Sequence, residues 1–125
     1  MSEKCGCSCD CGDSSPKIIY ACSGAANVGF LADNVSRKLV NDSCGKMSCL
    51  AAVGAGLSGF VESAKVTDNV VIDGCPVACG KKIFENNSLP YTHVILTEMG
   101  VEKGKTEITK ELITKVTEDV KGKIA

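Results

Sequence analysis

The chain has 125 residues, of which 44% are hydrophobic, and a formal net charge of -1. This length allows one domain with a buried core, and the near-neutral charge gives no electrostatic basis for binding nucleic acid. The apolar runs are far shorter than the roughly 20 residues of a membrane helix, and no secretory signal precedes the first of them. We therefore expect a cytoplasmic protein that binds neither nucleic acid nor membrane.

Residues 1–16 are expected to form a flexible, cysteine-rich tail, because they show no apolar periodicity. Four cysteines alternate with other residues in this tail: Cys5, Cys7, Cys9 and Cys11. Such thiols can bind a soft metal, can exchange metal with a second site, or can have no function. Residues 17–125 are expected to form a single α/β metal-binding domain.

The first half of this expected domain begins with a short buried strand at residues 17–22. A helix is predicted at residues 28–40, with Asn27 as its N-cap. Residues 41–47 are expected to form a loop. Apolar residues recur at helical spacing over residues 49–61, but three glycines interrupt them, so this helix is weak or closely packed.

The second half continues with a strand at residues 69–73 and a helix at residues 76–85, in which Pro76 takes the first helical position. Another strand is predicted at residues 91–97 and an amphipathic helix at residues 107–121. The order β-α-α-β-α-β-α indicates the α/β class. We expect a small three-layer domain with a mostly parallel sheet.

Four cysteines are expected at the carboxyl ends of the strands, where open parallel sheets bind their ligands. Cys22 follows the first strand and Cys75 follows the next. Cys79 lies one helical turn beyond Cys75 and is expected on the same face, and Cys49 begins the helix between the two strands. Zinc takes four such thiolates tetrahedrally, and a site with three thiolates keeps an open position for exchange or catalysis.

Three segments of the chain carry a recognisable pattern. They are Cys22-Ser23-Gly24-Ala25-Ala26-Asn27-Val28-Gly29, Lys46-Met47-Ser48-Cys49-Leu50-Ala51 and Asp73-Gly74-Cys75-Pro76-Val77-Ala78-Cys79-Gly80-Lys81-Lys82. The pattern resembles the DGC-domain family, named after the Asp-Gly-Cys motif. The resemblance implies zinc bound by four chelating cysteines, which by motif position are Cys22, Cys49, Cys75 and Cys79. Cys44 competes with Cys49 for the second place, and the tail cysteines have no counterpart in the pattern.

Two other functions remain open at this point. A thiol oxidoreductase or sulfur-transfer enzyme would use Cys75 as nucleophile and Cys79 or Cys22 as the resolving thiol. An iron–sulfur cluster is the alternative cofactor to Zn²⁺, because four cysteines suffice for one. His93, the single histidine, is expected to be structural or to face solvent. The expected partners are a metal ion and a further protein.

Overall fold

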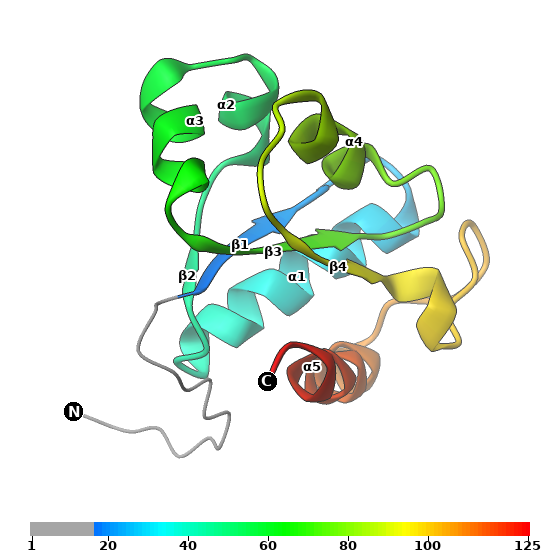
Figure 1. Cartoon of the computed structure of the whole chain (residues 1–125). Coiled ribbons are helices and arrows are strands. Elements are labelled where there is room, and N and C mark those ends of the chain that lie inside the picture. Colours follow the sequence, from blue (N-terminus) through cyan, green and yellow to red (C-terminus); the bar gives the residue numbers. More distant parts are fainter. Residues whose placement is uncertain (1–16) are drawn as a thin grey trace.

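The computed structural model describes residues 17–125, so the expected tail and its four cysteines lie outside the described residues. Four strands form one sheet in the order β2-β1-β3-β4, and all three pairings are parallel. The strands are β1 (Lys17–Ala21), β2 (Lys46–Met47), β3 (Asp68–Asp73) and β4 (Thr92–Ile95). The predicted α/β class is thereby confirmed (Figure 1).

Helices cover both faces of this sheet and make a three-layer arrangement (Figure 1). The helices are α1 (Asn27–Asn41), α2 (Leu50–Gly54), α3 (Ser58–Lys65), α4 (Cys79–Asn86), α5 (Lys110–Ile124) and the short 3-10 helix η1 (Leu96–Met99). Helices α1 and α5 pack on one face, and α2, α3 and α4 lie over the other. None of the helices described in residues 17–125 has the length and apolar character needed to span a bilayer.

The core divides between the two faces because successive strand residues point to opposite sides. Ile19 of β1 joins the cluster under α1 and α5, whereas the next residue, Tyr20, joins the cluster under the other helices. The ring of Tyr20 meets that of Phe84 edge-on, with the centroids 4.9 Å apart. The carboxyl end of β1 therefore lies between two separate apolar clusters.

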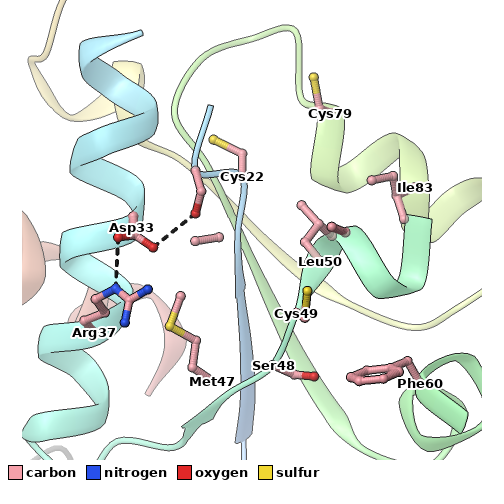
Figure 2. Close-up of a pocket in the computed structure, with 13 residues that line it drawn as sticks. Cys22, Asp33, Arg37, Met47, Ser48, Cys49, Leu50, Phe60, Cys79 and Ile83 are labelled. Atoms are coloured by element: carbon pink, nitrogen blue, oxygen red, sulfur yellow. Dashed lines mark hydrogen bonds and ion pairs between the residues drawn. The ribbon is translucent and has the colours of Figure 1, made fainter. Parts of the chain in front are cut away.

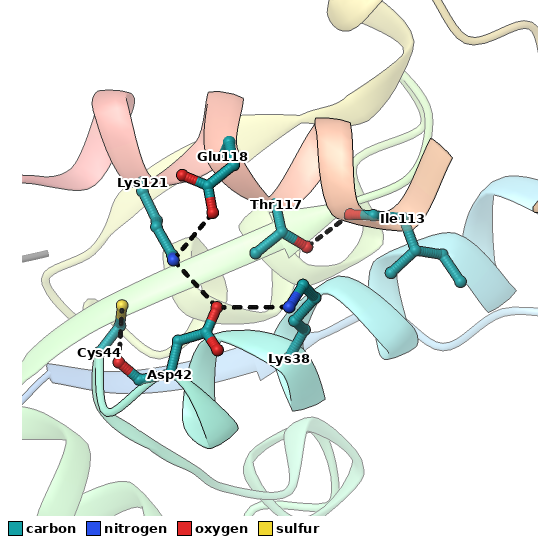
Figure 3. A network of polar contacts seen from close by, with 7 residues as sticks. All are labelled: Lys38, Asp42, Cys44, Ile113, Thr117, Glu118 and Lys121. Atoms are coloured by element: carbon teal, nitrogen blue, oxygen red, sulfur yellow. Dashed lines mark hydrogen bonds and ion pairs between the residues drawn. The ribbon is translucent and has the colours of Figure 1, made fainter. Parts of the chain in front are cut away.

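The C-terminal helix is tied to α1 by charges as well as by apolar packing (Figure 3). The Lys121 ammonium lies 2.9 Å from an Asp42 carboxylate oxygen and 3.0 Å from one of Glu118. Lys38 pairs with the same Asp42 oxygen at 3.6 Å. Burial by itself lowers the pKa of Lys121, but its hydrogen bonds to the two carboxylates and their charges raise that pKa above the ordinary value. The network thus joins the end of α5 to the end of α1.

Strand β2 was not predicted, because residues 41–47 were expected to form a loop. It pairs with β1 through only two residues, Ile18 with Lys46 and Ile19 with Met47. Two residues are too few to show the alternation by which a strand is recognised in a sequence. Beyond Ile19, the remaining residues of β1 have no strand partner on that side within residues 17–125.

The prediction of a single helix at residues 49–61 is wrong. The chain forms α2 and α3 instead, separated by residues 55–57. Gly56 lies between them with a φ of 74°, a left-handed conformation that glycine adopts without steric cost. The last helix also begins later than expected, at Lys110, because the Thr109 side chain caps it by accepting the Leu112 N–H.

Candidate functional site

A pocket of about 820 Å³ opens at the carboxyl edge of the sheet (Figure 2). It begins where β2 ends, and both Ala21 of β1 and Met47 of β2 line it. Helix α1 forms one wall, while α2, α3 and α4 contribute to the other. The short edge strand therefore leaves room for a ligand beside the end of β1.

Three thiols from three separate segments line this pocket: Cys22, Cys49 and Cys79 (Figure 2). Cys22 directly follows β1 and is half-buried. Cys49 is the N-cap residue of α2 and Cys79 is the first residue of α4, and both are exposed. The parallel topology explains why these thiols gather at one edge of the sheet.

Cys75 is not among the residues that line the pocket. It is half-buried and packs against the cluster under α1 and α5. Its sulfur accepts a hydrogen bond from the Lys103 ammonium at 3.5 Å. Cys22 stays close to this segment, because its sulfur accepts the Gly74 backbone N–H at 3.3 Å.

Cys75 and Cys79 do not share a helix face, because the expected helix start at Pro76 is wrong. Helix α4 begins at Cys79, after Ala78 in a left-handed conformation with a φ of 56°. Pro76 and Cys75 therefore belong to the preceding turn. A non-glycine residue in this region is unusual, and here it lies between the turn that holds Cys75 and the helix that begins at Cys79.

Asp73 determines where α4 begins. Its side chain is buried, and its two oxygens accept the backbone N–H groups of Gly80 at 2.8 Å and Lys81 at 3.0 Å. These are the second and third N–H groups of the helix, which a local N-cap residue normally satisfies. Asp73 thus caps α4 from the end of β3 and fixes the turn that presents Cys79.

The sequence did not predict that His93 pairs with this carboxylate. His93 Nε2 lies 2.7 Å from the second oxygen of Asp73, and its ring stands edge-on to that of Tyr91. Residue 93 lies opposite Val71 in the neighbouring strand, two positions before Asp73. In this register the side chains of Asp73 and His93 point to the same face of the sheet. The pair could not be predicted from the sequence, because the sequence does not give the register.

The glycine of the Asp-Gly-Cys motif allows β3 and α1 to approach closely. A Cβ atom on Gly74 would lie 2.6 Å from the carbonyl oxygen of Val28, in the first turn of α1. Gly80 is equally restricted, since its Cβ would lie 2.6 Å from a methyl carbon of Val71. Both glycines bring the pocket walls against the sheet.

Asn27 was expected to be the N-cap of α1, but that position is taken by Ala26. The Asn27 amide instead reaches across to residues 102–106. It donates to the carbonyl oxygens of Glu102 and Thr106 and accepts the Gly104 N–H. This segment carries Lys103, so Asn27 holds the partner of Cys75 in place.

A polar group from α1 and the turn before it stands on one side of the pocket (Figure 2). Arg37 Nε donates to Asp33 at 2.9 Å, and Ser23 Oγ donates to the other Asp33 oxygen at 3.1 Å. The hydrogen bond and the charge of Asp33 raise the pKa of Arg37 above its ordinary value. No local sequence motif joins these three residues, so their contact was not predictable from the sequence.

Cys44 lies away from the pocket. It precedes β2, at the amino edge of the sheet, and is only 2% exposed within the core. Of the two cysteines that competed for one place, Cys49 lines the pocket and Cys44 does not.

The pocket thiols suit a soft metal in their chemistry, because thiolates are strong zinc ligands. Their present spacing is wider than a metal site needs. Across residues 17–125, no three Cys, His, Asp or Glu side chains are grouped closely enough to hold an ion. Joint binding would require the exposed side chains of Cys49 and Cys79 to turn toward Cys22.

A relative from Pseudomonas aeruginosa, the anaerobic and virulence modulator AnvM, is 34% identical over 88 residues, which cover 69% of this chain and 67% of the relative. No solved structure matches the chain. The DGC domain matches residues 18–120. The chain therefore belongs to the DGC-domain family.

Proposed function

We propose that this protein binds one zinc ion through the thiolates of Cys22, Cys49 and Cys79. One observation carries the proposal: these three thiols come from distant segments and line a single pocket. A buried structural role does not explain the two exposed thiols, which stand at the starts of α2 and α4. Three protein ligands leave the fourth zinc position open, which suits exchange or regulation better than permanent structural support.

A closed site with four thiolates, as the family resemblance implies, would need Cys75 as its fourth ligand. Cys75 would have to leave the core cluster and its contact with Lys103 to reach the pocket. For this reason we assign the first three ligands to the pocket cysteines and expect Cys75 to matter less for zinc affinity.

The open site suits a regulatory role that depends on metal or thiol state. The relative AnvM is named as an anaerobic and virulence modulator. We propose by analogy that the pocket of this chain changes its interaction with a partner protein when zinc binds or leaves.

The direct experiment is elemental analysis of anaerobically purified protein. The full-length chain is used with Cys5, Cys7, Cys9 and Cys11 replaced by Ser, so that the tail cannot bind the metal. We expect about one zinc per chain, which falls severalfold in each of C22S, C49S and C79S because each removes a thiolate ligand. C75S is expected to keep most of the zinc.

The matched control is C44A, which removes a thiol outside the pocket and is expected to retain the zinc. Zinc that stays bound in all three pocket variants would overturn the assignment. Iron and acid-labile sulfide are measured in the same samples, because their presence with visible absorbance would indicate the iron–sulfur alternative.

A thiol-transfer enzyme remains the second candidate, on one specific observation. Cys75 stands apart from the pocket thiols and contacts Lys103, while Cys22 packs against the same core cluster. Alkylation of metal-free protein separates the two functions. One thiol that reacts much faster than the others, at Cys75, would favour the enzyme, whereas protection of the pocket thiols by zinc would favour the metal site.

A further inference from the structure

Strand β2 ends before β1 does, and this leaves the end of β1 without a neighbouring strand. The Ser48 N–H donates to the Ile19 carbonyl oxygen at 2.9 Å, and the chain then turns away into α2. On the opposite side of β1, the Cys22 N–H donates to the Ile72 carbonyl oxygen of β3 at 3.1 Å. Successive residues of a strand direct their backbone groups to alternate sides. The N–H and C=O of Ala21 therefore point away from β3, to the side where β2 has ended.

Both backbone groups of Ala21 are available to a ligand in the pocket. Ala21 lines the pocket and is only 5% exposed. Neither its N–H nor its C=O has a hydrogen-bond partner among residues 17–125. Buried backbone groups are nearly always paired, so a ligand that displaces water here must bring an acceptor and a donor of its own. One amino-acid residue in an extended conformation presents both along one edge.

Arg37 provides an anchor for an anionic group on the α1 wall of the pocket. Its Nε donates to Asp33, and its two terminal nitrogens have no partner among the residues that the structure describes. Figure 2 shows these nitrogens turned toward the pocket. Both oxygens of Asp33 are occupied, one by Arg37 Nε and the other by the Ser23 hydroxyl. A guanidinium held in this way can bind a carboxylate through two parallel hydrogen bonds.

The opposite wall of the pocket is apolar, and it is formed by Leu50, Phe60 and Ile83 (Figure 2). At about 820 Å³ the pocket falls within the range of about 300 to 1,000 Å³ typical of small-molecule sites. Its surroundings therefore match three chemical groups in one ligand, which are a carboxylate, a peptide unit and an apolar side chain.

We propose that the pocket binds a short peptide, two or three residues long, whose last residue is apolar. Its C-terminal carboxylate pairs with Arg37, and its last side chain packs on Leu50, Phe60 and Ile83. The residue before the last pairs with Ala21: its N–H donates to the Ala21 carbonyl oxygen, and its carbonyl oxygen accepts the Ala21 N–H. Because β1 ends at Ala21, a longer chain would find no further strand residue to pair with. The inference goes beyond the proposed zinc site and needs no metal ion.

The test is two-dimensional NMR of the anaerobically handled full-length protein, titrated with the dipeptide alanyl-leucine. The titration is made on the protein as purified and again after a chelator has removed any metal and has been dialysed away. We expect saturable binding with the same affinity in both samples. The Ala21 amide proton should shift on binding and should exchange with solvent more slowly, because it gains a carbonyl acceptor.

Three comparison compounds each lack one feature of the ligand. Alanyl-leucinamide lacks the carboxylate, alanylglycine lacks the apolar side chain, and leucine lacks the preceding residue. Each should bind about tenfold more weakly than alanyl-leucine. A six-residue peptide that ends in alanyl-leucine should bind within about threefold of the dipeptide, because the extra residues have no strand to pair with.

Arg37→Gln should reduce the affinity for alanyl-leucine about tenfold and leave that for alanyl-leucinamide unchanged. Arg37→Lys, which keeps the charge but lacks the paired donors, should fall between the parent and Arg37→Gln. The matched control is Lys115→Gln, because Lys115 is also 67% exposed and also pairs with an aspartate one helical turn away. It should bind like the parent.

Equal binding of alanyl-leucine and alanyl-leucinamide, or an Arg37→Gln variant that binds like the parent, would overturn this inference. An Ala21 amide that is unchanged at saturation would overturn the strand pairing. A six-residue peptide that binds more than about threefold tighter would show that the ligand is the end of a longer chain.

Binding that disappears when the metal is removed would also overturn the inference, because the peptide would then be held by the ion. Zinc analysis of the same samples reports separately on the proposed metal site. A protein without zinc that still binds alanyl-leucine would contradict the metal site alone.

Discussion

At the scale of single residues, Asp73 connects the fold to the pocket. Its buried carboxylate caps α4 by accepting two backbone N–H groups, and one of its oxygens lies 2.7 Å from His93 Nε2. The next residue, Gly74, allows the chain to pass the first turn of α1. The Asp-Gly-Cys motif therefore has a structural meaning for its first two residues, which is to set the position of the turn between Cys75 and Cys79.

The first prediction follows from this cap. Asp73→Asn keeps the size of the side chain but replaces one acceptor oxygen with a donor, which would face a backbone N–H or His93. We expect the free energy of unfolding to fall by about 2 kcal/mol, because a buried acceptor is lost and its donors remain unsatisfied. Urea denaturation of the metal-free protein measures this change.

Asp119→Asn is the control for this variant, since Asp119 is an exposed partner of Lys115 on α5. Its effect should stay within about 0.5 kcal/mol. Equal stability losses for the two variants would contradict the capping role of Asp73.

Residue roles could be predicted only where a local rule applies. The end-of-strand positions of Cys22 and Cys75 follow from short apolar runs, and the structure has both. The Asp73–His93 pair and the group around Arg37 depend on strand register and on helix placement. Those contacts depend on how separate elements are placed in the fold, so they could not be predicted from composition or from residue spacing.

At the scale of elements, α1 and α4 end in the same way. Ser43 and Ser88 follow the C-cap residues in left-handed conformations, with φ angles of 64° and 55°. After α4, the Ser88 N–H bonds to the Glu85 carbonyl and the Leu89 N–H to the Phe84 carbonyl, which is the Schellman pattern. Glycine is the usual residue at this position, since it adopts such angles without steric cost.

The second prediction concerns the replacement of Ser88 by glycine. Ser88→Gly should raise the free energy of unfolding by about 0.5 to 1 kcal/mol, because the exposed serine is held in a conformation that its Cβ disfavours. Thermal denaturation should show a higher melting temperature. Ser63→Gly, in the last turn of α3, should have the opposite sign and cost about 0.5 kcal/mol.

The two serine variants form an internal comparison, because both replace an exposed serine by glycine. A loss of stability in Ser88→Gly similar to that in Ser63→Gly would show that the helix end does not impose the left-handed conformation.

Most long elements were predictable because their apolar spacing persists over several turns or along a whole buried strand. Helix α1 and strands β1 and β3 lie within one residue of their expected bounds. Two of the errors fall where one backbone angle decides the outcome: Gly56 divides α2 from α3, and Ala78 delays the start of α4. Propensity and periodicity average over such single positions and do not detect them.

At the scale of the whole molecule, the pocket lies between helices from both layers. Its shape depends on how α1 is placed relative to α2, α3 and α4. The charged network at the C-terminal end of α1 ties α5 to this helix, which forms one wall of the pocket (Figure 3). Lys121 is its centre, with a side chain only 15% exposed. None of Lys38, Asp42, Glu118 and Lys121 lines the pocket, so the network can be changed without removing a proposed ligand.

The third prediction concerns Lys121→Met. We expect a loss of about 1 kcal/mol at pH 7, because Asp42 and Glu118 lose their shared cation. The pKa of Lys121 is higher in the folded than in the unfolded chain, so its contribution is complete below the ordinary lysine pKa of about 10.4 and declines as the pH rises above it.

The measurement is the difference in unfolding free energy between parent and variant at several pH values. The difference should be constant between about pH 7 and pH 9 and should shrink above about pH 11. Lys115→Met on the same helix should change stability by less than about 0.5 kcal/mol. A difference that grows with rising pH would contradict the assigned sign.

The central claim is that the pocket cysteines jointly hold one zinc ion. Zinc X-ray absorption on the full-length protein with its four tail cysteines replaced by Ser tests it most directly. We expect at least three sulfur ligands at about 2.3 Å, and one sulfur fewer on the zinc retained by Cys79→Ser. A zinc ion surrounded only by oxygen and nitrogen, or an unchanged sulfur shell in Cys79→Ser, would contradict it.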